Sequence, residues 1–160
     1  MRTGIGYDIH RMKEGRELVL GGVNIDSVRG LDGHSDADVV IHAVCDSLLG
    51  AASLGDIGRH FPDTDDEYKD ISSLRLLERT KEKIREVNYE TNNIDVTIVC
   101  QEPKLNTYIS AMEENIAQSL GIPVYDVNVK ATTNEGLDST GRTESIAAFA
   151  VATIIPAPEI

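Results

Sequence analysis

A chain of 160 residues is long enough for one domain, and its 41% of hydrophobic residues include no apolar run approaching the roughly 18 residues of a membrane-spanning helix. Asp and Glu number 27 against 15 Lys and Arg, so the formal net charge is −12. This charge argues against nucleic-acid binding, which needs a basic surface, but a small anionic substrate could be neutralised locally by metal ions, helix N-termini and a few cations.

The N-terminal segment alternates apolar and polar residues from Arg2 to His10, which predicts a strand. The segment lacks the basic, apolar and small-residue order of a secretory signal, so the chain as given is expected to be cytoplasmic. Glu17 to Leu20 and Val23 to Ile25 predict two short strands around Gly21-Gly22. These N-terminal strands are close enough in sequence to form a hairpin.

A helix is expected from near Asp36 to near Gly50, because Ser35-Asp36-Ala37-Asp38 has the form of a capping box before an apolar run. His34 and Ser35 stand just before its N-terminus, where free N–H groups and the helix dipole favour an anion. They are therefore candidates to bind phosphate. On the residues alone, the alternative is that Ser35 only caps the helix and His34 is exposed.

Asp8 and His10 lie two residues apart in the first predicted strand, so their side chains share one face. His42, in the following helix, can supply a third ligand, and two histidines with one carboxylate leave the open fourth position of a catalytic zinc site. Asp38 and Asp46, four residues on either side of His42, are candidates to accept its second ring N–H. The alternative is an accidental grouping, but all four histidines lie in the first 60 residues.

The segment Gly55 to Asp65 is polar and holds few residues able to form a core. On the residues alone it is interpreted first as an ordinary acidic surface turn, and the alternative is a functional loop whose acids grip hydroxyl groups. Apolar residues at helical spacing then predict two amphipathic helices, one through Leu74, Leu77, Ile84 and Val87, and one through Ile109, Met112, Ile116 and Leu120.

Strands are predicted at Asn93 to Gln101 and Val127 to Ala131, and the helix between them implies a right-handed parallel crossover. Ser145 to Ile155 is a run of small and branched apolar residues that predicts a strand buried on both faces, or a helix. The expected fold is α+β: a single domain over residues 1–160 with a mixed β-sheet covered by helices and a ferredoxin-like βαβ element. Cys45 and Cys100 are expected to be buried free thiols.

The segment Lys130 to Gly136 leaves its strand with two hydroxyls and an acid, Thr132, Thr133 and Glu135. A second metal and phosphate site is one interpretation. A strand end followed by a turn is the other.

Four groups of residues occur in a characteristic order: Gly6-Tyr7-Asp8-Ile9-His10; Gly33-His34-Ser35-Asp36-Ala37-Asp38; Gly55-Asp56-Ile57-Gly58 with Phe61-Pro62-Asp63-Thr64-Asp65; and Val127-Asn128-Val129-Lys130-Ala131-Thr132-Thr133. Together they resemble the 2-C-methyl-D-erythritol 2,4-cyclodiphosphate synthase family, over nearly the whole chain. Several motifs in one order are far more specific than any one of them.

The resemblance implies an enzyme of non-mevalonate isoprenoid biosynthesis that converts 4-diphosphocytidyl-2-C-methyl-D-erythritol 2-phosphate into the 2,4-cyclodiphosphate and CMP. The substrate's own 2-phosphate would attack the β-phosphorus, so no side-chain nucleophile is needed. A homotrimer with active sites between neighbouring subunits is also implied. The alternatives are a metal-dependent phosphatase and a non-enzymatic trimeric metal or nucleotide sensor.

Residue by residue, the resemblance implies zinc at Asp8, His10 and His42, and magnesium or manganese at Glu135. His34 and Thr133 are implied to stabilise the transition state by hydrogen bonds. The implied substrate-binding positions are Asp8, Ile9, His10, His34 and Ser35; Asp56, Ile57, Gly58, Phe61, Pro62, Asp63, Thr64 and Asp65 around the methylerythritol; Cys100, Gln101, Glu102, Pro103, Lys104, Leu105 and Asn106 at the cytidine; and Thr132, Thr133, Asn134, Glu135, Ser139 and Arg142.

One departure from the family pattern concerns Leu137-Asp138-Ser139-Thr140-Gly141-Arg142, which lacks the Gly-Phe that many relatives place before Thr-Gly-Arg. Arg142 matches a diphosphate-binding position in the central trimer cavity of relatives. Isoprenoid-diphosphate binding there is therefore expected, but weakened by Ser139. Cys100 and Glu102 also vary, which matters little if backbone atoms read the cytosine.

Overall fold

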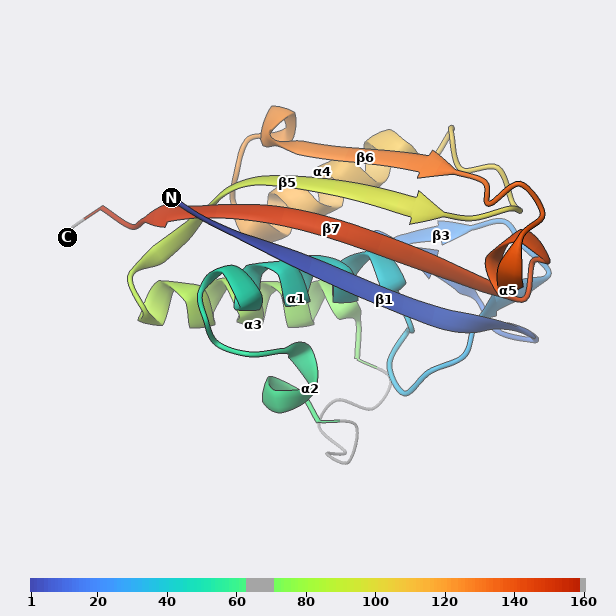
Figure 1. The fold of residues 1–160 in the computed structure, drawn as a ribbon, viewed down its shortest axis with the longest axis horizontal. Coiled ribbons are helices and arrows are strands. Elements are labelled where there is room, and N and C mark those ends of the chain that lie inside the picture. The colour runs from blue at the N-terminus through green and yellow to red at the C-terminus, as the bar shows by residue number, and fades with distance from the viewer. Residues whose placement is uncertain (63–70, 159–160) are drawn as a thin grey trace.

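The computed structural model of the chain describes residues 1–62 and 71–158 (Figure 1). In these residues, four strands are followed by three helices, strands and helices alternate only after that, and the predicted helices and longer strands are all present. In chain order the elements are β1 Arg2–Glu14, β2 Leu18–Leu20, β3 Val23–Ile25, β4 Arg29–Leu31, α1 Val39–Ala51, α2 Ile57–His60, α3 Ser73–Glu86, β5 Tyr89–Val99, α4 Ile109–Leu120, the 3₁₀ helix η2 Val124–Asp126, β6 Val127–Thr132, α5 Asp138–Gly141 and β7 Ser145–Pro156.

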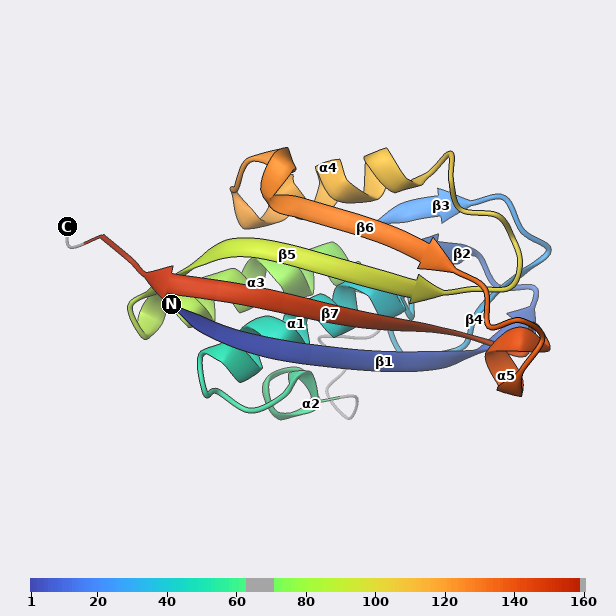
Figure 2. The ribbon, with the colours of Figure 1, turned by 45° about the horizontal axis from the view of Figure 1, so that its top comes forward.

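The main sheet has five strands in the order β4-β1-β7-β5-β6 (Figure 2). β1 and β5 both pair antiparallel with β7, whereas β5 and β6 pair parallel across the connection through α4. β2 and β3 form a separate antiparallel hairpin around Gly21-Gly22. The expected mixed sheet, parallel crossover and N-terminal hairpin are thus confirmed.

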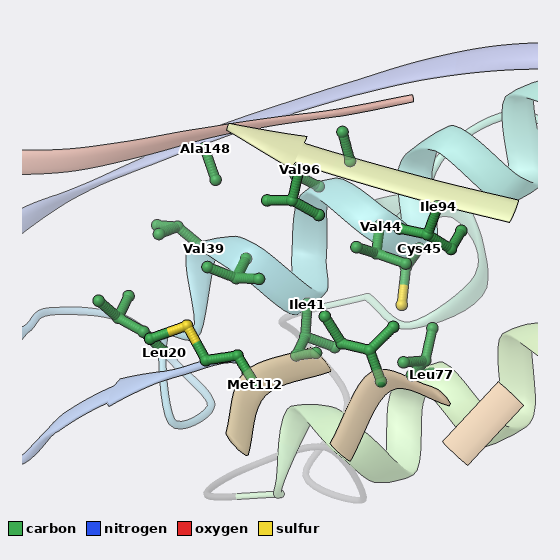
Figure 3. Packing of buried hydrophobic residues seen from close by; sticks show 14 of the residues in the cluster. Leu20, Val39, Ile41, Val44, Cys45, Leu77, Ile94, Val96, Met112 and Ala148 are labelled. Carbon is green, nitrogen blue, oxygen red and sulfur yellow. The ribbon is translucent and has the colours of Figure 1, made fainter. Parts of the chain in front are cut away.

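Helices α1, α3 and α4 pack on one face of the main sheet and enclose the core (Figure 3). Ile41 of α1, Leu77 of α3 and Met112 of α4 are fully buried. Ile94 and Val96 of β5 point toward these helices, as the period of two along a strand requires. Within the described parts of the chain, no helix is long and apolar enough to cross a membrane.

Two glycines of β1 let helix α1 lie unusually close to the strand. A Cβ atom at Gly4 would stand 2.0 Å from the Ser47 carbonyl oxygen, and one at Gly6 only 1.9 Å from the Ala43 carbonyl oxygen. No side chain fits at either position. The close approach determines how far α1 stands from β1, which continues from Gly6 directly into Asp8.

Two expectations about these elements were wrong. Helix α1 begins after Asp38, whose side chain accepts hydrogen bonds from the Val40 and Ile41 amides, so Asp38 rather than Ser35 is the N-cap. Strand β7 is covered on one face only, and Phe149 and Val151 are 43% and 39% exposed. The helices all lie on the opposite face of the sheet, which a run of apolar residues does not reveal.

Candidate metal centre and substrate cavities

Asp8 and His10 project from β1 toward the helix-covered face, where α1 presents His42. Asp8 Oδ2 lies 3.1 Å from His10 Nε2 and 3.0 Å from His42 Nδ1. Within residues 1–62 and 71–158, these three are the one group of acidic, histidine or cysteine side chains whose ligand atoms lie close enough, within 4.8 Å of one another, to hold a metal ion. The fold therefore assembles the group that the sequence suggested.

The hydrogen bond of the outward nitrogen of His10, Nδ1, determines whether the inward nitrogen, Nε2, keeps a lone pair for a metal. Nδ1 lies 2.7 Å from the backbone carbonyl oxygen of Asp32, which can only accept a hydrogen bond. Nδ1 therefore carries a proton, and a neutral ring keeps its lone pair on Nε2, the atom that faces Asp8. Such a carbonyl partner commonly orients a metal-binding histidine.

The outward nitrogen of His42 has two serine partners. Nε2 lies 3.0 Å from Ser73 Oγ and 3.2 Å from Ser35 Oγ. The expectation that Asp38 or Asp46 fills this role is not met, because both carboxylates bind backbone amides instead. Asp38 accepts from Gly21, Gly22, Val40 and Ile41, and Asp46 accepts from Ile57 at 2.7 Å.

A cation is needed to make this arrangement favourable. When the two rings are neutral and carry their protons on the outward nitrogens, a carboxylate oxygen and two ring lone pairs converge within about 3 Å. Three acceptors repel one another unless a positive charge lies between them. One carboxylate and two imidazoles fit zinc, which leaves a fourth tetrahedral position for substrate.

Without a metal, protons on the rings of His10 and His42 can supply the positive charge that Asp8 faces. Burial acts to raise the pKa of Asp8, but hydrogen bonds and charge from His10 and His42 outweigh it, so the pKa is well below its usual value. Asp8 therefore stays ionised at neutral pH, in the form that binds a metal.

A cavity of about 280 Å³ opens beside the three ligands. His34 lies on its wall, and His34 Nε2 is buried with no hydrogen-bond partner among the described residues. A buried unpaired ring nitrogen is costly, so it favours a ligand atom at that point. The described residues that line the cavity are Asp8, His10, Gly33, His34, Ser35, His42, Ile57, Gly58, Phe61 and Leu76.

The acidic loop is held against this cavity by its backbone. Asp56 caps the short helix α2 by accepting from the Arg59 amide at 2.9 Å, and the Ile57 amide donates to Asp46 of α1. Ile57 and Phe61 thereby line the cavity, and Phe61 is 5% exposed. Pro62 is half-buried, whereas Asp63, Thr64 and Asp65 lie outside the described residues.

The segment expected to bind cytidine lines a different and smaller cavity, of about 100 Å³, at the ends of β5 and β6. Gln101 connects this segment to the loop after β6, because Gln101 Oε1 accepts hydrogen bonds from the backbone amides of Asn134 and Gly136. Glu102 is exposed beside it. This cavity is lined by Cys100, Pro103, Lys104, Leu105, Asn106, Ala131, Thr132 and Thr133, and none of the described residues lines both this cavity and the metal cavity.

The remaining candidates lie between β6 and β7, Glu135 in the loop after β6, Ser139 in α5 and Arg142 directly after α5. Glu135 is exposed, and its Oε1 accepts a long hydrogen bond of 3.4 Å from the Thr133 hydroxyl. Arg142 forms two hydrogen bonds with Glu144, at 3.0 and 3.1 Å. Ser139 is hydrogen-bonded to Ser145 at 2.8 Å.

Neither cysteine has a reactive thiol. Both are free and buried, as expected. Burial raises the pKa of Cys45 to about 12 and that of Cys100 to about 11, so neither is ionised near neutral pH.

Sequence reasoning missed the Asp32 carbonyl and the pair Asp36 and Ser73, which surround the two histidine rings. A backbone carbonyl leaves no mark in a sequence. Ser73 lies 31 residues from His42, and its only signal was a polar residue at the start of a predicted amphipathic helix.

Comparison with known families gives a match to the model of the YgbB family over residues 1–155. Among curated relatives, the 2-C-methyl-D-erythritol 2,4-cyclodiphosphate synthase of Alkaliphilus metalliredigens is 57% identical over 154 residues, which cover 96% of this chain and 97% of the relative. That of Desulfosudis oleivorans is 58% identical over 155 residues, which cover 97% and 92%.

Solved structures agree with the sequence comparison. The bifunctional IspDF from Campylobacter jejuni matches with a TM-score of 0.92 and 44% identity, over 96% of this chain but 42% of that longer one. A CDP complex of IspF from Plasmodium falciparum matches with a TM-score of 0.85 and 34% identity, over 98% of this chain and 97% of the other.

Proposed function

This chain belongs to the YgbB family of 2-C-methyl-D-erythritol 2,4-cyclodiphosphate synthases, and we propose that Asp8, His10 and His42 form the metal centre at which it performs that reaction. The reaction is the conversion of 4-diphosphocytidyl-2-C-methyl-D-erythritol 2-phosphate to the 2,4-cyclodiphosphate and CMP. The observation that carries the proposal is the convergence of the three ligand atoms beside a cavity. Zinc is the proposed metal, from the donor set.

The chemistry is an intramolecular phosphoryl transfer. An oxygen of the 2-phosphate forms a bond to the β-phosphorus, and the bond from that phosphorus to the bridging oxygen breaks, so the electron pair leaves with CMP. A bound metal supplies charge neutralisation at the phosphate oxygens. The protein's main task is to fold the substrate so that the two phosphates meet, which can contribute about 7 to 11 kcal/mol.

Each cavity has a proposed share of the substrate. The unpartnered His34 Nε2 and Ser35 are placed to contact phosphate beside the metal, and Ile57, Gly58 and Phe61 enclose the methylerythritol. The segment Cys100 to Asn106 is proposed to receive the cytidine, and the existence of CDP complexes of relatives supports a cytidine nucleotide as ligand. Thr133 and Glu135 are proposed at the diphosphate, with Glu135 binding magnesium or manganese.

We propose that the complete active site forms between neighbouring chains of a homotrimer. Two observations support this. Within residues 1–62 and 71–158, no residue lines both the metal cavity and the cytidine cavity of one chain, and the uncovered face of the sheet exposes Tyr7, Phe149 and Val151. A central-cavity isoprenoid diphosphate at Arg142 would have to displace Glu144 from the guanidinium.

Product analysis tests the function directly. The purified chain is incubated with the cytidylated substrate and Mg²⁺, and CMP with an equal amount of cyclic diphosphate is the expected result. Release of inorganic phosphate would instead identify a phosphatase, and binding without turnover a sensor. The comparisons favour neither of those alternatives.

A further inference from the structure

Ser73, the first residue of α3, joins the metal centre to the carboxylate of Asp36, which is half-buried. Its side chain is fully buried, and its hydroxyl donates a short hydrogen bond to Asp36 Oδ1. Its backbone amide donates to Asp36 Oδ2 at 2.9 Å, and its Oγ also lies 3.0 Å from His42 Nε2. Asp36, Ser73 and His42 therefore form a continuous chain of hydrogen bonds.

The carboxylate determines the direction of every bond in this chain. A serine hydroxyl has one proton, and here Asp36, which can only accept, takes it. Ser73 Oγ then offers only lone pairs to His42, so Nε2 must be the donor. The lone pair of a neutral His42 is left on Nδ1, the atom that faces Asp8 and the metal position.

This direction matters because His42 has a competing arrangement. A neutral ring could place its proton on Nδ1 and donate it to Asp8 Oδ2, only 3.0 Å away, and in that form Nδ1 cannot bind a metal. We infer that Asp36 and Ser73 are positioning residues that hold the proton of His42 on Nε2 and keep Nδ1 available to the metal.

Ser35, the other hydroxyl near His42, cannot do this alone. Its Oγ lies 3.2 Å from His42 Nε2 and accepts from the Ala37 amide, but among the described residues no acceptor other than the ring takes its own proton. It can therefore either donate to the ring or accept from it. Ser35 also lines the cavity as a proposed phosphate contact, whereas Ser73 does not, so Ser73 can keep its bond to His42 when substrate binds.

The inference rests on the proposed metal centre and predicts a specific loss in Ser73→Ala. Zinc affinity, measured in competition with a chromophoric chelator, should fall 10- to 100-fold, the usual effect of losing such a partner. In the zinc-loaded protein, the NMR signal of the His42 Nε2 proton should also exchange faster with solvent. Ser47→Ala is the matched control, because Ser47 is equally buried but donates to the Val44 carbonyl, and it should change neither readout.

Asp36→Asn provides a second, nearly isosteric variant in case Ser73→Ala does not fold. The two donors of Ser73 bind different oxygens of Asp36, and a side-chain amide replaces one of those oxygens by an NH2 group, so one of the two bonds is lost and zinc affinity should again fall at least tenfold. The inference is wrong if a folded variant of either kind binds zinc within twofold of the wild type with an unchanged Nε2 proton signal. If the wild-type chain itself binds no zinc, the proposed metal centre is wrong, and not only the positioning role of Asp36 and Ser73.

Discussion

At the scale of single residues, the hydrogen-bond partners of His10 and His42 determine which ring nitrogens are available to a metal. The Asp32 carbonyl and the Ser73 hydroxyl each hold a ring proton outward, and the inward nitrogens then face Asp8. The −12 charge of the chain is no obstacle to an anionic substrate, because a cation at this point neutralises phosphate locally.

Replacing a proposed ligand should abolish turnover without unfolding the protein. Asp8→Ala and His42→Ala are expected to lower CMP release at least about 1,000-fold, since a metal supplies several kcal/mol of charge stabilisation. Far-ultraviolet circular dichroism checks the fold. Cys45→Ala removes a buried side chain outside the site and should keep most of the activity; retained turnover in metal-free Asp8→Ala would falsify the metal centre.

The lowered pKa of Asp8 predicts a pH dependence of stability in the chelator-treated protein. A carboxyl whose pKa is lower in the folded than in the unfolded chain stabilises the fold at every pH above its pKa in the unfolded chain, which is about 3.8. This contribution is lost as the pH falls through the lower pKa of the folded chain. The difference in unfolding free energy between wild type and Asp8→Asn, from urea titrations, should therefore be present at pH 5 and shrink below pH 3.8. A difference that grows on acidification would contradict this assignment.

At the scale of elements, the contact between β1 and α1 positions the site. One strand supplies two ligands and one helix the third, and Gly4 and Gly6 allow the two backbones to approach. The parallel pair β5 and β6 positions the segment proposed to bind cytidine in a similar way, because both strands end at the same edge of the sheet. The metal cavity also draws wall residues from α2 and α3, among them Ile57 and Leu76.

Gly6→Ala should damage the metal centre through the backbone alone. The added Cβ would meet the Ala43 carbonyl at 1.9 Å, so α1 must move away from β1, and His42 moves with it. We expect a loss of about 3 kcal/mol in unfolding free energy and weaker zinc binding. Gly50→Ala, in helix α1, is the control. A Cβ atom at Gly50 meets nothing within 4 Å, so this substitution should stabilise the fold by about 0.5–1 kcal/mol. Urea unfolding and chelator competition measure both; wild-type zinc affinity in Gly6→Ala would show that the spacing is unimportant.

At the scale of the whole molecule, the sheet has one covered face and one uncovered face. Tyr7 and Phe149, paired across β1 and β7, stack there with ring centroids 4.8 Å apart, next to exposed Ile5 and Val151. An apolar strip of this kind is typical of an interface between chains. It is the physical basis for the proposed homotrimer.

Phe149→Glu should separate assembly from metal binding. A charge on the uncovered face is expected to shift the chain from trimer to monomer in sedimentation velocity. CMP release should fall at least tenfold, because the metal cavity of one chain would no longer lie beside the cytidine cavity of the neighbouring chain. Zinc affinity should stay within twofold of the wild type, since all three ligands come from one chain. A monomeric variant with full activity would overturn the interfacial site.

The sequence by itself determined the α+β fold class, the parallel crossover and the pairing of Asp8 with His10, because strand and helix periods dictate which side chains share a face. Its motifs also indicated the family. Tertiary structure decided that Ser73 and not Asp38 or Asp46 contacts His42, that β7 is open on one face, and that the segment proposed to bind cytidine lines a separate cavity. These features depend on contacts between residues far apart in the chain, whose distances local periodicity does not specify. The cap of α1 is local, but Asp38 also accepts from the Gly21 and Gly22 amides, which the sequence pattern does not reveal.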